Sequence, residues 1–190
     1  MTTAQAEKIT DEIMELYNGY GGNEYAGEKV TQLEHMVQAA QLAEEQGFDE
    51  EVILAAFLHD IGHLSEEAAE TGRMGAFGIK DHEELGAEFL RGKGFSKKVC
   101  RLVESHVEAK RYLTLKDPAY YAELSEASKK TLEYQGGPMT TEEAAAFEQY
   151  PLFKLIIQMR KWDEQAKIEH KPLPDLQHYR RMMLRHLLNS

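Results

Sequence analysis

The 190-residue sequence has a single cysteine, Cys100. One cysteine cannot form an internal disulfide, and its scarcity fits a reducing compartment. The neighbouring residues, Val99-Cys100-Arg101-Leu102, follow a helical pattern, so we expect the thiol to be a small core residue. The amino terminus is polar and has no apolar stretch of the kind found in signal peptides. We therefore expect a cytoplasmic protein.

Long apolar runs and an excess of positive charge are also absent. The longest apolar run is far too short to cross a bilayer. There are 22 Lys and Arg against 33 Asp and Glu, which gives a net charge of -11 at pH 7. This charge argues against a nucleic acid or an anionic membrane as a partner, because both would be repelled. It does not exclude a small anion, because salt screens charges beyond about 8 Å and a site can supply its own cations.

The alternation of apolar and polar residues that marks strands is scarce, whereas Ala, Leu, Glu, Lys and Met are abundant. This composition favours helices throughout, so we predict an all-α protein. With 190 residues, 42% of them hydrophobic, the chain suits one compact domain. We expect a single domain over 1–190, with a helix and a loop in 1–30, a core in 31–170 and a terminal helix in 171–190.

Hydrophobic periodicity and capping signals predict where the helices lie. Asp49 can cap a helix that starts just after it, and Thr140 with Glu143 forms a capping-box signature. Polar, glycine-rich residues from Leu64 to Gly78 predict a surface excursion. The predicted helices are Thr10–Asn18, Thr31–Gln46, Val52 to His59-Asp60, Lys80–Lys93, Lys97–Lys110, Tyr120–Tyr134, Leu152–Lys167 and Leu176–Leu188.

One stretch carries most of the chemistry: Val52-Ile-Leu-Ala-Ala-Phe-Leu-His59-Asp60-Ile-Gly-His63. An apolar helix ends here in adjacent His and Asp side chains, and a further His follows. Buried and unpaired, such groups would cost on the order of several kcal/mol, so each needs hydrogen bonds or a cation. An isolated His-Asp pair could simply cap a helix. Further metal-capable side chains lie on other predicted helices, namely His35, His82, His106 and Asp163.

This order of side chains resembles the HD-domain superfamily of helical, metal-dependent proteins, over about His35 to Asp163. The resemblance implies an HD-domain helical bundle with a dinuclear metal site in its core. A carboxylate such as Asp60 can bridge two cations, and imidazole-rich sites suit iron, zinc, manganese or cobalt rather than calcium. Taken alone, His82 and His106 would be ordinary structural histidines. The implied ligands are His35, His59, Asp60, His82, His106 and Asp163.

The ligand set leaves two reaction classes open. Many HD proteins are phosphohydrolases, whose metals activate water, and a smaller branch consists of mixed-valence di-iron oxygenases. Four segments resemble oxygenases that convert 2-amino-1-hydroxyethylphosphonate to glycine and phosphate. These are Tyr25-Ala-Gly-Glu28, His106-Val-Glu-Ala-Lys110-Arg-Tyr-Leu, Ser128-Lys-Lys-Thr131-Leu-Glu-Tyr-Gln135-Gly-Gly-Pro-Met and Arg160-Lys-Trp-Asp163-Glu. This resemblance implies an oxidoreductase with two iron ions (Fe2+/Fe3+) and O2 as co-substrate.

The same resemblance implies roles for residues outside the ligand set. Tyr25, His63 and Lys110 would be catalytic, with Tyr25 leaving an iron ion when substrate binds. Glu28 would pair with the substrate's ammonium group. A phosphonate dianion needs cations and hydrogen-bond donors. The resemblance assigns its binding to His63, Lys110, Ser128, Thr131, Gln135 and Arg160. Each of these residues, taken singly, also fits an ordinary place on a helix or at the surface.

Two alternatives stay open. One is the same chemistry on the N-trimethylated substrate, giving glycine betaine. A quaternary ammonium group favours an aromatic cage over a carboxylate, although Tyr20 and Tyr25 are near Glu28 in the sequence. The other is an HD-domain metal-dependent phosphohydrolase, or a metal-holding regulatory module without catalysis. We expect a small organophosphonate as partner and neither nucleic acid nor membrane, and the oligomeric state is open.

Overall fold

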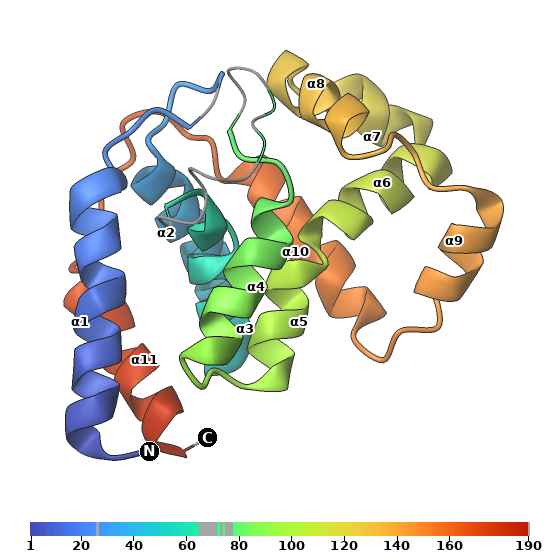
Figure 1. The fold of residues 1–190 in the computed structure, drawn as a ribbon. Coiled ribbons are helices and arrows are strands. Elements are labelled where there is room, and N and C mark those ends of the chain that lie inside the picture. Colours follow the sequence, from blue (N-terminus) through green and yellow to red (C-terminus); the bar gives the residue numbers. More distant parts are fainter. Residues whose placement is uncertain (26, 65–71, 73, 75–77, 190) are drawn as a thin grey trace.

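The computed structural model describes residues 1–25, 27–64, 72, 74 and 78–189. Within these ranges the chain is helical (Figure 1) and has no named strand, and an isolated antiparallel bridge joins Glu24 to Thr31. The all-α prediction is confirmed. None of the described helices is long and apolar enough to span a membrane. The elements are α1 (Thr3–Tyr20), α2 (Gln32–Glu45), α3 (Glu50–Leu58), the 3-10 turn η1 (Ile61–His63), α4 (His82–Gly92), α5 (Lys97–Glu104), α6 (His106–Lys116), α7 (Pro118–Glu123), α8 (Glu126–Tyr134), α9 (Thr141–Phe147), α10 (Phe153–Gln165) and α11 (Gln177–Asn189).

Side-chain caps set the starts of several helices. Asp49 accepts a hydrogen bond from the backbone of Val52 and so begins α3, as predicted. The capping box of Thr140 and Glu143 begins α9, also as predicted. The expected start of the first helix was wrong, because α1 begins at Thr3 rather than Thr10. A capping box between Thr2 and Gln5 provides the earlier start.

Two predicted helices are each divided in the structure. The helix expected over Lys97–Lys110 is interrupted at Ser105, and its second part continues to Lys116. At the interruption the imidazole Nδ1 of His106 donates to the carbonyl of Val103, so a side chain takes an oxygen that a helical N–H would otherwise use. The helix expected over Tyr120–Tyr134 is α7 and α8, because the side chains of Asp117 and Ser125 each cap a new start.

Helix α3 lies at the centre of the molecule and contacts α2, α5, α10 and α11. Every residue from Val52 to Leu58 is buried. The ring of Phe57 stacks on Tyr17 of α1 and on Tyr179 of α11, and the Tyr17 hydroxyl donates to the Phe57 carbonyl at 2.6 Å. Cys100 is buried in the same core, as the sequence predicted. The carboxyl end of a wholly buried helix therefore delivers His59 and Asp60 to the interior.

A close backbone approach joins η1 to α4. A Cβ atom on Gly62 would lie 1.9 Å from the carbonyl oxygen of His82 and 2.9 Å from the backbone nitrogen of Gly86. Only glycine fits at such a distance, because a side chain would overlap backbone atoms. This contact brings Asp60, two residues before Gly62, beside the first residue of α4. The predicted excursion from Leu64 to Gly78 lies largely outside the described residues.

Candidate metal centre and adjoining cavity

Five segments far apart in the sequence bring the six predicted ligands together. His35 comes from α2, His59 and Asp60 follow α3, and Asp163 lies on α10. The remaining two, His82 and His106, are the first residues of α4 and α6. All six side chains are buried. The helices that carry these residues pack together, since α10 contacts α2, α3 and α6 (Figure 1).

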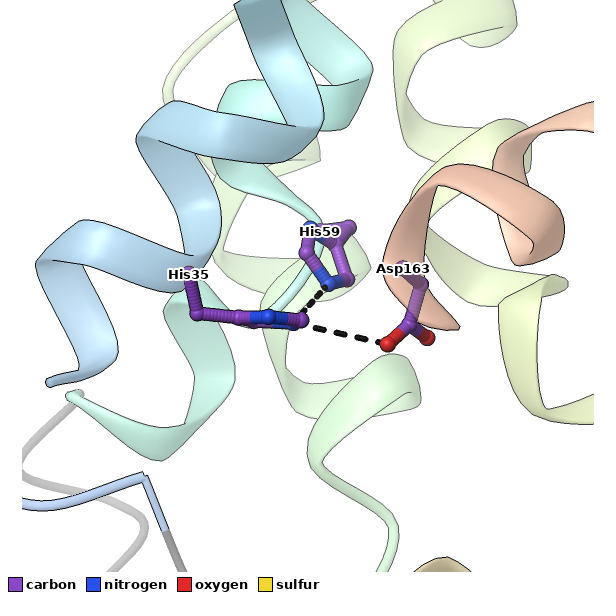
Figure 2. A group of neighbouring side chains, drawn as sticks. All are labelled: His35, His59 and Asp163. Atoms are coloured by element: carbon purple, nitrogen blue, oxygen red, sulfur yellow. Dashed lines mark hydrogen bonds and ion pairs between the residues drawn. The ribbon is translucent and has the colours of Figure 1, made fainter. Parts of the chain in front are cut away.

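One half of the cluster is formed by His35, His59 and Asp163, which point toward one another in Figure 2. The Nε2 atom of His35 lies 3.1 Å from Nε2 of His59 and 3.4 Å from Oδ1 of Asp163. The Oδ2 atom of Asp60 lies 3.5 Å from Nε2 of both histidines. His35, His59 and Asp163 thus form a group whose nitrogen and oxygen ligand atoms suit a transition-metal ion.

The other half is formed by His82 and His106, whose Nε2 atoms are 3.0 Å apart. The Oδ1 atom of Asp60 lies 3.3 Å from Nε2 of His82 and 3.4 Å from Nε2 of His106. The two oxygens of Asp60 therefore face two different pairs of histidines. That is the arrangement of a carboxylate that bridges two cations.

Backbone carbonyls fix the orientation of all four ligand histidines. Each donates its Nδ1 hydrogen to a main-chain oxygen, so that in the neutral ring Nε2 carries no hydrogen and is directed into the cluster. Burial lowers the pKa of His106 to about 3, so this ring is neutral. The four pairs are His35 with Ala166 (3.0 Å), His59 with Ala56 (2.8 Å), His82 with Ile79 (3.2 Å) and His106 with Val103 (2.7 Å).

Whether cations fit this cluster can be judged from its carboxylate oxygens that lack a hydrogen-bond donor. Oδ2 of Asp60 and Oδ1 of Asp163 are buried and have no hydrogen-bond partner among the described residues. Burial raises the pKa of Asp60, but the nearby His59 and His82 outweigh it and hold this pKa well below its usual value. Buried, ionised oxygens without donors are strongly unfavourable unless a cation compensates them. The residues around these oxygens therefore fit a metal ion, and Asp60, His63 and His82 form a second group that could hold one.

His63 lies beside the cluster in the opposite tautomeric arrangement. Its Nδ1 accepts a hydrogen bond from the backbone of Ile79 at 3.2 Å, and its ring stacks on that of His82 with centroids 3.9 Å apart. Burial, followed by the charge of His82, lowers the pKa of His63 well below its usual value, so the ring is neutral. A neutral ring whose Nδ1 accepts must carry its hydrogen on Nε2. His63 is thus arranged as a donor, unlike the four ligand histidines.

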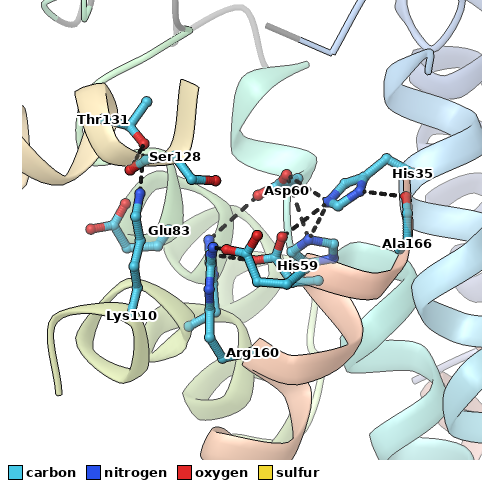
Figure 3. Close-up of polar contacts among 12 residues, drawn as sticks. His35, His59, Asp60, Glu83, Lys110, Ser128, Thr131, Arg160 and Ala166 are labelled. Carbon is cyan, nitrogen blue, oxygen red and sulfur yellow. Dashed lines mark hydrogen bonds and ion pairs between the residues drawn. The ribbon is translucent and has the colours of Figure 1, made fainter. Parts of the chain in front are cut away.

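A cavity adjoins the metal cluster, and Lys110 reaches into it from α6 (Figure 3). The Lys110 Nζ donates to Oγ1 of Thr131 at 2.5 Å and to Oε1 of Gln135 at 2.8 Å. Burial, followed by the charge of Arg160, lowers the pKa of Lys110 to about 6. The cavity is lined by Tyr25, Glu28, Gln32, His63, Met74, Gly78, His82, His106, Val107, Lys110, Ala127, Ser128, Thr131, Gln135, Arg160 and Asp163.

Arg160 is held rigidly between the cavity and the metal cluster. Its Nη1 donates to Oδ2 of Asp163 at 2.5 Å and its Nη2 pairs with Glu164. Its Nε donates to the hydroxyl of Tyr120 at 2.9 Å. Arg160 therefore orients a metal ligand while it lines the cavity. Sequence reasoning assigned no role to either partner: Tyr120 lies outside the motifs, and Glu164 is the last residue of the Arg160-Lys-Trp-Asp163-Glu segment.

Comparison with known proteins agrees with this geometry. Residues 33–146 match the family model described as HD domain. The chain belongs to the HD domain family. Its matched segment contains five of the six clustered side chains, His35, His59, Asp60, His82 and His106. The predicted family and the HD-domain helical bundle are therefore confirmed.

Three relatives of this HD domain protein cover most of its length. The chain is 47% identical over 178 residues, covering 94% of it and 81% of the relative, to "Uncharacterized protein L432" of Acanthamoeba polyphaga mimivirus. It is 43% identical over 182 residues (93% and 89%) to the "[1-hydroxy-2-(trimethylamino)ethyl]phosphonate dioxygenase (glycine-betaine-forming)" of Leisingera caerulea. It is 41% identical over 180 residues (94% and 88%) to the "Hydroxymethylphosphonate dioxygenase" of Gimesia maris.

The structure also places the other residues singled out from the sequence. Tyr25, Glu28, His63, Ser128 and the remaining predicted substrate-binding residues all line the one cavity beside this HD domain cluster. The ring of Tyr25 stacks on His35, with centroids 4.0 Å apart. Burial, followed by the charges of Asp60 and Asp163, raises the pKa of the Tyr25 phenol well above its usual value. The structure brings these residues together but does not assign a role to each.

Proposed function

We propose that this HD domain protein is a di-iron, O2-dependent oxidoreductase that cleaves the carbon–phosphorus bond of a 1-hydroxyphosphonate. Our preferred substrate is 2-amino-1-hydroxyethylphosphonate, which with one O2 gives one glycine and one phosphate. The observation that carries the proposal is a buried cluster in which the two oxygens of Asp60 face different pairs of histidines, beside a cavity lined by Lys110 and Arg160. Two relatives named as phosphonate dioxygenases, 43% and 41% identical, support it.

Six residues would hold the metals, with Asp60 shared between the two positions. Bound there, a pair of iron ions would supply the activation of dioxygen that the protein's own side chains cannot provide. The protein itself orients the ligands through Nδ1 hydrogen bonds and excludes water by burial. The residues proposed as ligands are His35, His59, Asp60, His82, His106 and Asp163.

The phosphonate group would bind at the Lys110 end of the cavity. A dianion there would exchange contacts with Thr131 and Gln135, which already accept hydrogen bonds from the Lys110 amine. Because burial depresses the pKa of Lys110, an arriving dianion favours its protonation, and ammonium and phosphonate then form a charge-assisted pair. Ser128 and Arg160 would add donors, and His63 would donate from Nε2 to a substrate oxygen.

Another part of the cavity would hold the substrate's amine. Glu28 lines the cavity and provides a carboxylate there. Tyr25 is the one aromatic side chain besides histidine among the described lining residues, and Tyr20 is 48% exposed. A trimethylated ammonium group is usually held by several aromatic faces. This composition favours a primary amine over the N-trimethylated substrate, which gives glycine betaine.

Tyr25 would act as a movable group at the edge of the metal cluster. It belongs to the loop before α2 rather than to a helix, and its ring covers that of His35. Loops can shift without disturbing a packed core. We propose that the Tyr25 phenol covers the side of His35 that faces the cavity and moves away when the substrate binds.

The test is to load the protein with ferrous iron without air and then measure O2 uptake and phosphate release together. The substrates are 2-amino-1-hydroxyethylphosphonate, its N-trimethylated analogue and hydroxymethylphosphonate, with p-nitrophenyl phosphate as a hydrolysis control. We expect one O2 consumed per phosphate released, and the best kcat/KM with the primary amine. Phosphate release that proceeds equally without O2 would instead establish a phosphohydrolase.

A further inference from the structure

A lysine that no motif singled out lies against Glu28. The Nζ atom of Lys167 lies 2.9 Å from Oε1 of Glu28, 3.1 Å from Oε2 of Glu164 and 3.4 Å from Oγ of Ser128. The side chains of Lys167 and Glu28 are only 16% and 15% exposed. Their charges are therefore mostly removed from water, and each needs the other as a partner.

The backbone on both sides of Lys167 is fixed. The carbonyl of Ala166 accepts the Nδ1 hydrogen of His35 at 3.0 Å. The amide side chain of Gln38 donates to the carbonyl of Ile168 and accepts from its N–H, both at 3.0 Å. These contacts tie the segment to α2 and to the metal cluster. Lys167 is thus positioned by the fold and is not a freely moving surface lysine.

Glu28 is held so that one oxygen remains for a ligand. Its Oε1 accepts from Oγ of Ser125 at 2.6 Å as well as from Lys167. Both of these contacts use Oε1, so Oε2 is the oxygen that a ligand in the cavity could contact. Lys167 has a second carboxylate in Glu164, toward which it can shift when another cation approaches Glu28. Lys167 therefore already supplies a positive charge beside Glu28 before any substrate binds.

We propose that Lys167 determines how strongly the site requires a cationic head group, by neutralising Glu28 when the substrate brings no ammonium group. This inference rests on the proposed function. With Lys167 present, a 1-hydroxyphosphonate without an amine can bind without leaving the Glu28 carboxylate unpaired. An aminated substrate shares Glu28 while Lys167 pairs with Glu164. The protein thus accepts both classes, and Lys167 is a specificity-determining residue that touches the head-group carboxylate rather than the reacting atoms.

The test compares two ligands that differ only in the amine, 2-amino-1-hydroxyethylphosphonate and 1-hydroxyethylphosphonate. Their dissociation constants are measured by calorimetry on the iron-loaded protein without O2, so that binding is read without turnover. Lys167→Met should raise the preference for the aminated ligand at least tenfold, mainly by weakening the other ligand. Lys167→Arg keeps the charge and should stay within threefold of the wild type.

Two further variants separate this role from a general structural one. Lys154→Met removes an exposed positive charge from α10 and should leave the preference unchanged. In a Glu28→Gln background, Lys167→Met should change the preference less than twofold, because the carboxylate it neutralises is gone. An unchanged preference in Lys167→Met, or equal weakening of both ligands, would overturn the inference. Wild-type protein that binds both ligands but releases no phosphate in air would overturn the proposed function alone, and binding of neither would overturn both.

Discussion

Replacement of Lys110 by methionine should stabilise the metal-free protein at neutral pH, by an amount that falls as the pH rises. Lys110 is 3% exposed. Burial and the charge of Arg160 lower its pKa from 10.5 to about 6. The folded state therefore holds this side chain mostly neutral above pH 6, whereas the unfolded chain keeps it protonated up to about pH 10. Methionine has a similar length and no charge to desolvate.

The sign and the size follow from proton linkage. Between the two pKa values the unfolded state binds one more proton than the folded state, so Lys110 makes the wild type more stable as the pH rises. Each pH unit in this window corresponds to about 1.4 kcal/mol. At pH 7.5 the gap to the unfolded pKa is about three units, so the penalty is on the order of 2–4 kcal/mol. The lower end of this range applies if water in the cavity partly solvates the Lys110 side chain.

Urea unfolding of chelator-treated wild type and Lys110→Met at pH 7, 8 and 9 measures this penalty. The difference in free energy of unfolding between the two proteins should shrink by about 1.4 kcal/mol per pH unit. Taking this difference cancels the titration of the histidines and carboxylates that both proteins share. The unsatisfied oxygens of Thr131 and Gln135 add a constant that does not depend on pH. A difference that stays the same from pH 7 to pH 9 would refute the reasoning.

Three further predictions concern the metal positions and the core. His106→Ala should bind one iron ion instead of two by elemental analysis, because the second half of the cluster keeps His82 and loses its other imidazole; two retained ions would argue against the assignment. Gly62→Ala should lower the Tm by several degrees and weaken the second metal position, since the new Cβ would lie 1.9 Å from the carbonyl oxygen of His82; an unchanged Tm by differential scanning calorimetry would contradict this. Tyr17→Phe should reduce the free energy of unfolding by roughly 1–3 kcal/mol, measured in urea, because the hydroxyl that donates to the buried carbonyl of Phe57 is lost.

Much of the fold follows from local signals in the sequence. The apolar stretch from Val52 to Leu58 predicted a buried helix, and the Asp49 and Thr140 caps predicted where two helices begin. The Thr2 and Gln5 capping box was present too, and would have placed the first helix correctly. Such signals are short-range, since they involve groups three or four residues apart. The divisions at Ser105 and Ser125 were not predicted, although the contacts that mark them, His106 with Val103 and Ser128 with Ser125, also join residues three apart.

The sequence by itself determined the identity and order of the six clustered side chains, through spacing that resembles a family. Only the tertiary structure decided that the two oxygens of Asp60 face different pairs of histidines. It also decided that His63 accepts at Nδ1 while the ligand histidines donate there, and that Lys167 pairs with Glu28. These features depend on backbone groups and on contacts between distant residues, such as Lys167 with Glu28, which are 139 positions apart. A hydrogen bond is set by distance and direction in the folded chain, and no pattern of residue types records either.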